Sequence, residues 1–146
     1  AADCYGNVAR GSSMDAELAL YEKARLEAKA LGQSARALAT LDEHRQRFAG
    51  GVLTTEVELT RIELLSQLGR RAEALQAIER GLGGTLGRER GGDLQVLRAE
   101  LLSAGGDCTA AREAAALARA AGAHASRLKA TEQRCPARAE TEAEAQ

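Results

Sequence analysis

Three glycines recur at a fixed interval of 37 residues, at Gly32, Gly69 and Gly106. Each is followed five residues later by an alanine, and residues 61–66 (RIELLS) are nearly repeated by residues 98–103 (RAELLS). A fixed period in the thirties, built from helix-forming residues, is typical of stacked helix hairpins. A single hairpin cannot bury its apolar stripe, so neighbouring hairpins share a core. The repeat predicts an all-α fold of three stacked helix-turn-helix hairpins, a short α-solenoid.

Apolar spacing and the intervening glycines place the expected helices. Ser13 is suited to cap the first helix, with Glu17 in its first turn. Helices are expected over residues 13–31, 34–48, 54–68, 71–82, 93–104, 109–121 and 124–135, the last being a C-terminal capping helix. The glycine-rich residues 81–92 are expected to form a mobile loop between repeats.

The chain is expected to divide into three stretches. Residues 1–12 lack periodicity and should form a loose lead-in, and residues 13–135 should form the helical-repeat domain. Residues 136–146 are acidic and low in complexity, which predicts a disordered tail.

The predicted core is aliphatic. Aromatic residues make up only 2% of the chain, so Leu, Ile, Val and Ala must fill the interior. Helical spacing turns Leu18 and Leu68 inward with the other core leucines. The repeated alanines at 37, 74 and 111 are expected to be buried where the two helices of each hairpin cross.

The composition argues against nucleic-acid binding and against a membrane span. A net charge of −1 and very few aromatic rings argue against nucleic-acid binding. The longest fully apolar run covers residues 114–118, far shorter than a membrane span requires.

This frame resembles the tetratricopeptide repeat, a family of helix-turn-helix units, over residues 18–121. The family's turn glycine, small residue and large apolar residue correspond to Gly32-Ala37-Leu41 and Gly69-Ala74-Ile78. Gly106 and Ala111 fit the first two slots of the third repeat, whereas Ala115 is smaller than the pattern requires. The sequence departs from the pattern at apolar slots occupied by Glu58, Arg61, Gln95 and Arg98, and its period is longer. The resemblance implies a module that binds a peptide or helix in a concave groove, without the lysine–asparagine clamp of some family members.

A weaker resemblance concerns residues 38–48 and 68–74, which are similar to the repeat region of envelope regulators in GC-rich predatory soil bacteria. In those proteins the repeat region follows a membrane anchor and a regulatory domain. This resemblance implies that the chain is part of a larger envelope-associated protein.

Two of the three cysteines are expected to form a disulfide. Cys108 opens one helix and Cys135 closes the next, so an antiparallel pair of helices would bring them together. Closing such a loop would add about 3 kcal/mol of stability. The alternative is two unrelated thiols in a reducing cytosol. A disulfide favours a periplasmic, extracytoplasmic location over a cytoplasmic one, and Cys4 is left unpaired.

Neither a metal site nor an active site is expected. The cysteines and the two histidines, His44 and His124, show no short ligand spacing, and exposed histidines are the simpler interpretation. The sequence has no nucleophile with an orienting partner and no phosphate-binding glycine motif. We therefore expect a chain that is not an enzyme and has no cofactor.

A partner-binding groove is the remaining candidate site. The helical period and the 37-residue repeat place one set of side chains along the first helix of the second and third hairpins. The predicted groove residues are Glu56, Thr60, Glu63, Gln67, Asp93, Leu97 and Glu100. Their carboxylates should be exposed or paired with arginine, and would favour a basic protein or peptide ligand.

Two functions follow from these expectations. The first is a non-catalytic protein-protein interaction module. The second is a structural or oligomerisation domain, in which two copies pair through exposed leucines at Leu53, Leu59, Leu97 or Leu102.

Overall fold

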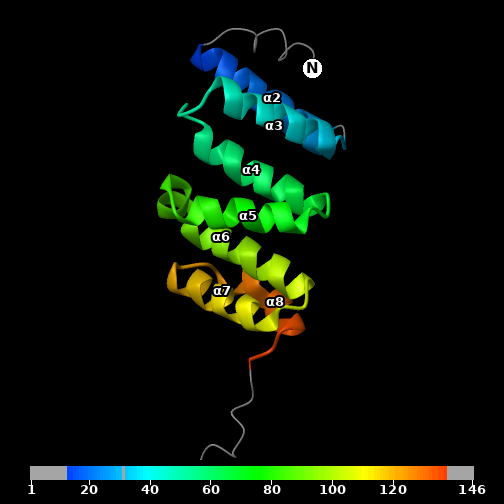
Figure 1. Ribbon diagram of the computed structural model, residues 1–146, viewed down its shortest axis with the longest axis vertical. Coiled ribbons are helices and arrows are strands. Elements are labelled where there is room, and N and C mark those ends of the chain that lie inside the picture. The colour runs from blue at the N-terminus through cyan, green and yellow to red at the C-terminus, as the bar shows by residue number, and fades with distance from the viewer. Residues whose placement is uncertain (1–12, 31, 138–146) are drawn as a thin grey trace, which may run out of the picture. The chain divides into compact units, whose positions relative to one another are not determined.

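The computed structural model describes residues 13–30 and 32–137, and these contain helices but no strand (Figure 1). The elements are α2 (Met14–Lys29), α3 (Ser34–Arg47), α4 (Thr54–Gln67), α5 (Arg71–Leu82), α6 (Thr85–Ala104), α7 (Cys108–Ala120), the 3-10 helix η1 (Ala125–Leu128) and α8 (Lys129–Arg134). The all-α class is confirmed. The expected lead-in over residues 1–12, and all but the first two residues of the expected tail, lie outside the described residues.

The helix ends follow local sequence signals. The Ser13 side chain accepts a hydrogen bond from the backbone N–H of Ala16, as a helix N-cap should. Gly69 and Gly106 adopt φ angles of 73° and 86°, which glycine tolerates best. After each glycine the next amide donates back five residues, from Arg70 to the Leu65 carbonyl and from Asp107 to the Leu102 carbonyl. Gly32, with φ of 60°, marks the first turn, so all three expected turns are present.

The expected loop over residues 81–92 is wrong. Only residues 83–84 separate α5 from α6, and the single non-helical residue within α6 is Arg90, where the helix is kinked. Each glycine costs a helix only about 1 kcal/mol, and burial of Leu86 offsets part of that cost. A Cβ at Gly87 would overlap the Leu82 backbone, so this glycine allows a close approach between α5 and α6.

The described residues form two compact units, which divide between Glu89 and Arg90. In the first unit α2 packs on α3, α3 on α4 and α4 on α5. A core cluster joins its first three helices and consists of Ala24, Ala37, Leu41, Val57 and Leu64. No helix in the described part of either unit is both long and apolar enough to cross a membrane.

The second unit contains the later part of α6, α7, η1 and α8. Its core cluster consists of Val96, Ala99, Ala114, Ala115, Ala118 and Leu128. Cys108 and Cys135 form a disulfide, with an S–S distance of 2.02 Å and Cα atoms 5.1 Å apart. The expected pairing is therefore present, and it joins the start of α7 to the residue that follows α8.

The repeated alanines behave as expected, whereas some leucines do not. Ala37, Ala74 and Ala111 are each fully buried. Leu18 is 48% exposed. The buried face of α2 includes Leu20, and because Leu18 lies two positions before Leu20, its side chain points to the opposite side of the helix. Leu68 is also exposed, since it follows the last residue of α4 as its C-cap.

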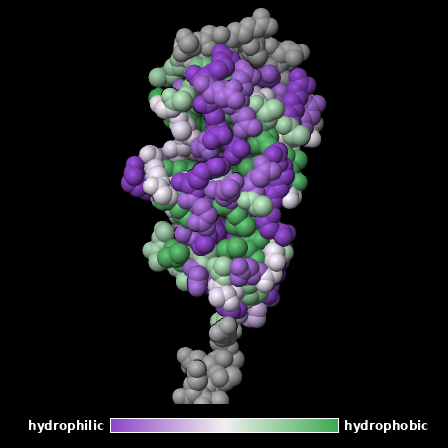
Figure 2. All heavy atoms as spheres, viewed as in Figure 1, coloured by the Kyte–Doolittle hydropathy of each residue, from purple (hydrophilic) through white to green (hydrophobic). Residues whose placement is uncertain are grey.

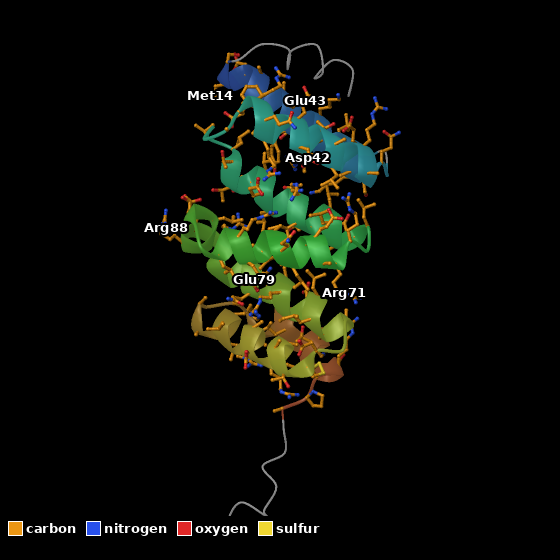
Figure 3. The ribbon with its side chains drawn as sticks, viewed as in Figure 1. Met14, Asp42, Glu43, Arg71, Glu79 and Arg88 are labelled. Carbon is orange, nitrogen blue, oxygen red and sulfur yellow. A yellow bond between two sulfur atoms is a disulfide. The ribbon has the colours of Figure 1, made fainter. Side chains whose placement is uncertain are left out.

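The leucines suggested for pairing two copies are also mostly unsuited to that role. Leu59 is buried, and Leu53, Leu97 and Leu102 are half-buried. Leu53 packs against the first core cluster and Leu102 against the second. Among the residues that the structure describes, the exposed large apolar side chains are instead Met14, Leu18, Val52, Leu68 and Leu117, of which Met14 lies at the first turn of α2 (Figure 3).

Candidate protein-binding face

The predicted groove residues of the first unit all lie on α4. Glu56, Glu63 and Gln67 are exposed, and Thr60 is half-buried. The spacings of four, three and four residues place them on one side of the helix. Thr60 Oγ1 lies 3.2 Å from the hydroxyl of Tyr21 on α2, at hydrogen-bond distance. This contact links a side chain of α2 to one of α4.

Tyr21 also has a cationic neighbour. The Arg25 guanidinium carbon lies 5.9 Å from the centre of the Tyr21 ring, and Arg25 donates a 2.9 Å hydrogen bond to Glu22. We use the name α2–α4 face for the surface formed by Tyr21, Arg25, Glu56, Thr60, Glu63 and Gln67. It combines one aromatic ring with exposed carboxylates and polar groups. Figure 2 shows many hydrophilic side chains, with apolar ones between them, on the visible side of the molecule.

The predicted groove residues of the second unit lie on α6 and are more enclosed. Asp93 forms ion pairs with Arg90, at 2.7 Å, and with Arg127. Hydrogen bonds from Arg127, which has the larger effect, and from Arg90 lower the pKa of the Asp93 carboxyl. Asp93 is therefore already engaged within its own unit.

Leu97 and Glu100 are half-buried. Burial raises the pKa of the Glu100 carboxyl, and the nearby Arg127 and Arg134 oppose that shift. Glu100 is not exposed, and within the described residues it forms no ion pair with an arginine. This position therefore differs from the expectation that the groove carboxylates are exposed or paired. The structure thus places an open polar set on α4 and a more enclosed set on α6.

A buried polar cluster in the first unit was not anticipated from the sequence. The Glu17 carboxylate on α2 accepts a 2.9 Å hydrogen bond from the backbone N–H of Leu53, at the start of α4. Its Oε1 atom also lies 3.5 Å from Nε2 of His44 on α3. A Cβ at Gly51 would overlap this carboxylate, which explains the glycine there. Glu17 therefore connects three helices.

His44 is buried, which corrects the expectation of exposed histidines; only His124 is exposed. The His44 ring centre lies 5.2 Å from that of Phe48. Burial lowers the pKa of His44 from its ordinary value of 6.5, with Glu17 and Glu58 opposing and Arg47 reinforcing the shift.

We expect the stability of the fold to decrease as the pH falls below 6.5. The unfolded imidazole takes up a proton near that pH, whereas the folded one does so only at lower pH, so acid favours the unfolded chain. Melting temperatures measured from pH 7.5 to 5.5 should show this decrease in the unaltered chain. His44→Gln should reduce the slope, and the control His124→Gln should keep it. Equal slopes in both variants would contradict the assignment to His44.

A second buried carboxylate belongs to Glu27. Thr40 donates a 2.7 Å hydrogen bond to its Oε2 atom, and Arg36 lies 3.3 Å from its Oε1 atom. Lys23 completes the site at 4.0 Å. These partners join α2 to α3 and compensate the buried charge.

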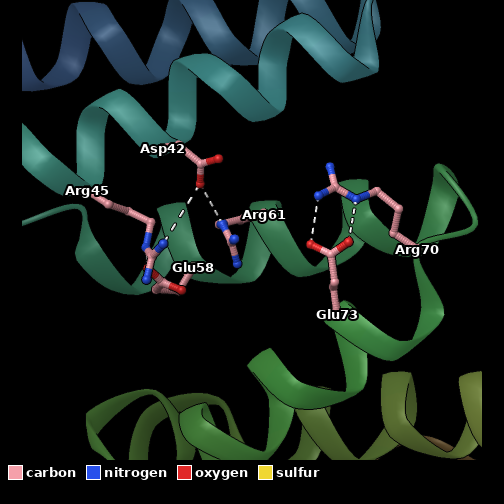
Figure 4. A network of polar contacts seen from close by, with 6 residues as sticks. All are labelled: Asp42, Arg45, Glu58, Arg61, Arg70 and Glu73. Carbon is pink, nitrogen blue, oxygen red and sulfur yellow. Dashed lines mark hydrogen bonds and ion pairs between the residues drawn. The ribbon is translucent and has the colours of Figure 1, made fainter.

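Ion pairs engage Glu58 and Arg61, two of the polar residues at slots that the repeat pattern would fill with apolar side chains (Figure 4). Asp42 on α3 accepts a 2.8 Å hydrogen bond from Arg61 on α4, and Arg45 pairs with Glu58 across the same two helices. The Arg61 side chain is only 13% exposed. Contacts between α3 and α4 therefore combine the apolar cluster with a polar network.

The described residues contain no group of three or more His, Cys, Asp or Glu side chains arranged to hold a metal ion. Comparison with protein-family models, curated proteins and solved structures found no match to this chain.

Proposed function

We propose that this chain is a non-catalytic protein-protein interaction module of the tetratricopeptide-like class. In this proposal the three hairpins stack as a short α-solenoid, and their first helices provide a concave face that binds a peptide or helix. The observation that carries the proposal is the agreement of the 37-residue period with three glycine turns and three fully buried alanines. Helical repeats of this kind offer extended binding surfaces.

The α2–α4 face supports a partner with basic side chains. Glu56 and Glu63 are seven residues apart, so they lie about 10 Å from each other along α4. Lysines two turns apart on a partner helix would have matching spacing. Tyr21 adds an aromatic contact on α2, where the charge of Arg25 is paired with Glu22. We assign the binding of a basic peptide or helix to this face.

The module is proposed to act outside the cytoplasm, as part of a larger envelope-associated protein. The support is the disulfide between Cys108 and Cys135, since disulfides persist mainly in oxidising compartments.

Reversing one charge on α4 tests the proposed face. Glu63→Lys should weaken binding of a fluorescent helical peptide with lysines at positions i, i+4 and i+7 by about five- to tenfold, because an attraction becomes a repulsion. The loss should shrink as salt rises from low to physiological concentration. Fluorescence polarisation measures both effects.

Glu113→Lys is the matched control, because Glu113 is exposed on α7 and its reversal changes the net charge equally. It should leave the affinity nearly unchanged. A peptide with glutamates in place of the lysines should bind poorly. If Glu63→Lys and Glu113→Lys bind the lysine peptide equally well, the α2–α4 face is not the site.

A further inference from the structure

A cleft of about 470 Å³ lies between α7 and α8 in the second unit. It is lined on α7 by Arg112, Ala115 and Arg119, and on the other side by Thr131, Glu132 and Cys135. The Cys108–Cys135 disulfide joins the start of α7 to the end of α8 and so holds one end of the cleft. A volume of this size lies within the range of small-ligand sites in proteins.

Thr131 supplies an unused polar group in the lining of this cleft. The residue is only 1% exposed, and its Oγ1 atom has no hydrogen-bond partner within the described part of the chain. Buried hydroxyl groups are almost always hydrogen-bonded in native proteins. An unsatisfied hydroxyl in the lining therefore indicates a place where a ligand can supply the missing partner.

The two arginines give the cleft an excess of positive charge. Arg119 forms an ion pair with Glu132 across the cleft. Arg112 donates a 3.3 Å hydrogen bond to the carbonyl oxygen of Pro136, and it has no carboxylate partner among residues 13–30 and 32–137. Arg112 is thus a cation without a counter-ion in the described structure. Its planar guanidinium is suited to bind a carboxylate through two parallel hydrogen bonds.

We propose that this cleft binds a peptide carboxylate, with Arg112 as the cationic anchor and the Thr131 hydroxyl as an additional donor. Ala115 and Pro136 provide apolar surface beside the charged group. The carboxylate is that of an acidic side chain or of a peptide C-terminus, which share this chemistry. The site lies in the second unit and does not depend on the α2–α4 face, so either proposal can fail alone.

The test uses calorimetric or NMR titration of the full chain, with its disulfide intact, with three N-acetylated tripeptides. Acetyl-Ala-Glu-Ala-amide presents a side-chain carboxylate, acetyl-Ala-Ala-Ala with a free C-terminus presents a terminal one, and acetyl-Ala-Gln-Ala-amide presents neither. At least one carboxylate peptide should bind about tenfold more tightly than the Gln peptide, and the stronger of the two identifies the source. Equal affinities for all three peptides would overturn the proposal.

Three variants assign the contacts. Arg112→Gln should lower the affinity for the preferred peptide about tenfold. Lys129→Gln removes an equal charge from an exposed position on α8 and should not change it. Thr131→Val should lower the affinity severalfold while raising the melting temperature, because it removes a buried unsatisfied hydroxyl. If Thr131 has only a structural role, Thr131→Val will leave the affinity unchanged, and the hydroxyl is then not part of the proposed site.

The chain's own acidic residues at 140, 142 and 144 could compete with an added peptide. The titrations are therefore repeated in a variant with Glu140, Glu142 and Glu144 all changed to Gln. Tighter binding in this variant would support the preference of the cleft for carboxylates. Absence of binding in both backgrounds would overturn the site.

Discussion

Replacing Cys108 and Cys135 with serine should lower the free energy of unfolding of the second unit by about 3 to 4 kcal/mol. The disulfide closes a segment with a sequence separation of 27 residues and thereby limits the freedom of the unfolded chain. It also connects α8, a helix of only six residues, to the longer α7. So short a helix has little stability of its own in water, and α8 should become the least protected part of the unit.

Urea denaturation of the oxidised chain and of the double serine variant measures this loss. Amide hydrogen exchange should show faster exchange in α8 than in α7 once the disulfide is removed. Cys4→Ser is the control and should be neutral. Thiol titration of the denatured, unreduced chain should find one free thiol; three free thiols would contradict the disulfide under those conditions.

Replacing Glu17 with alanine should lower the free energy of unfolding of the first unit by about 2 to 4 kcal/mol. The change removes the hydrogen-bond acceptor of the Leu53 N–H and the carboxylate that lies 3.5 Å from the buried His44 ring. It also leaves a void against Gly51, where the carboxylate now packs closely.

Two further variants separate these effects in the same denaturation experiment. Asp15→Ala removes an exposed acidic residue from the same first turn of α2 and should cost less than about 1 kcal/mol. Glu17→Gln keeps an oxygen acceptor for Leu53 and should fall between the two alanine variants. If Glu17→Ala were no more destabilising than Asp15→Ala, the buried carboxylate would not connect the three helices as described.

The candidate binding face was only partly predictable from the sequence. The helical period places Glu56, Glu63 and Gln67 on one side of α4, since that depends only on spacing within one helix, and all three are exposed. The pairing of Asp93 with Arg127 could not be anticipated, since the two residues are 34 positions apart. Such contacts depend on how separate helices pack, and a single helix period carries no information about that.

The sequence by itself determined the helix ends and the turns between them. The N-cap at Ser13 and the glycines at 69 and 106 act through their own backbone and the adjacent residues, so their effect does not depend on distant parts of the chain. The burial of Ala37 and its two counterparts followed from the same repeat.

Only the tertiary structure decided which polar groups are buried and whether the glycine-rich segment is helical. Glu17, His44 and Gly51 come from different parts of the first unit, and their contacts exist only after three helices have packed. Likewise, local propensity favoured a loop over residues 81–92, yet packing of Leu86 and the close approach of Gly87 to Leu82 accommodate a helix there. Burial and close contact between helices contribute free energies at least as large as the local preferences they override.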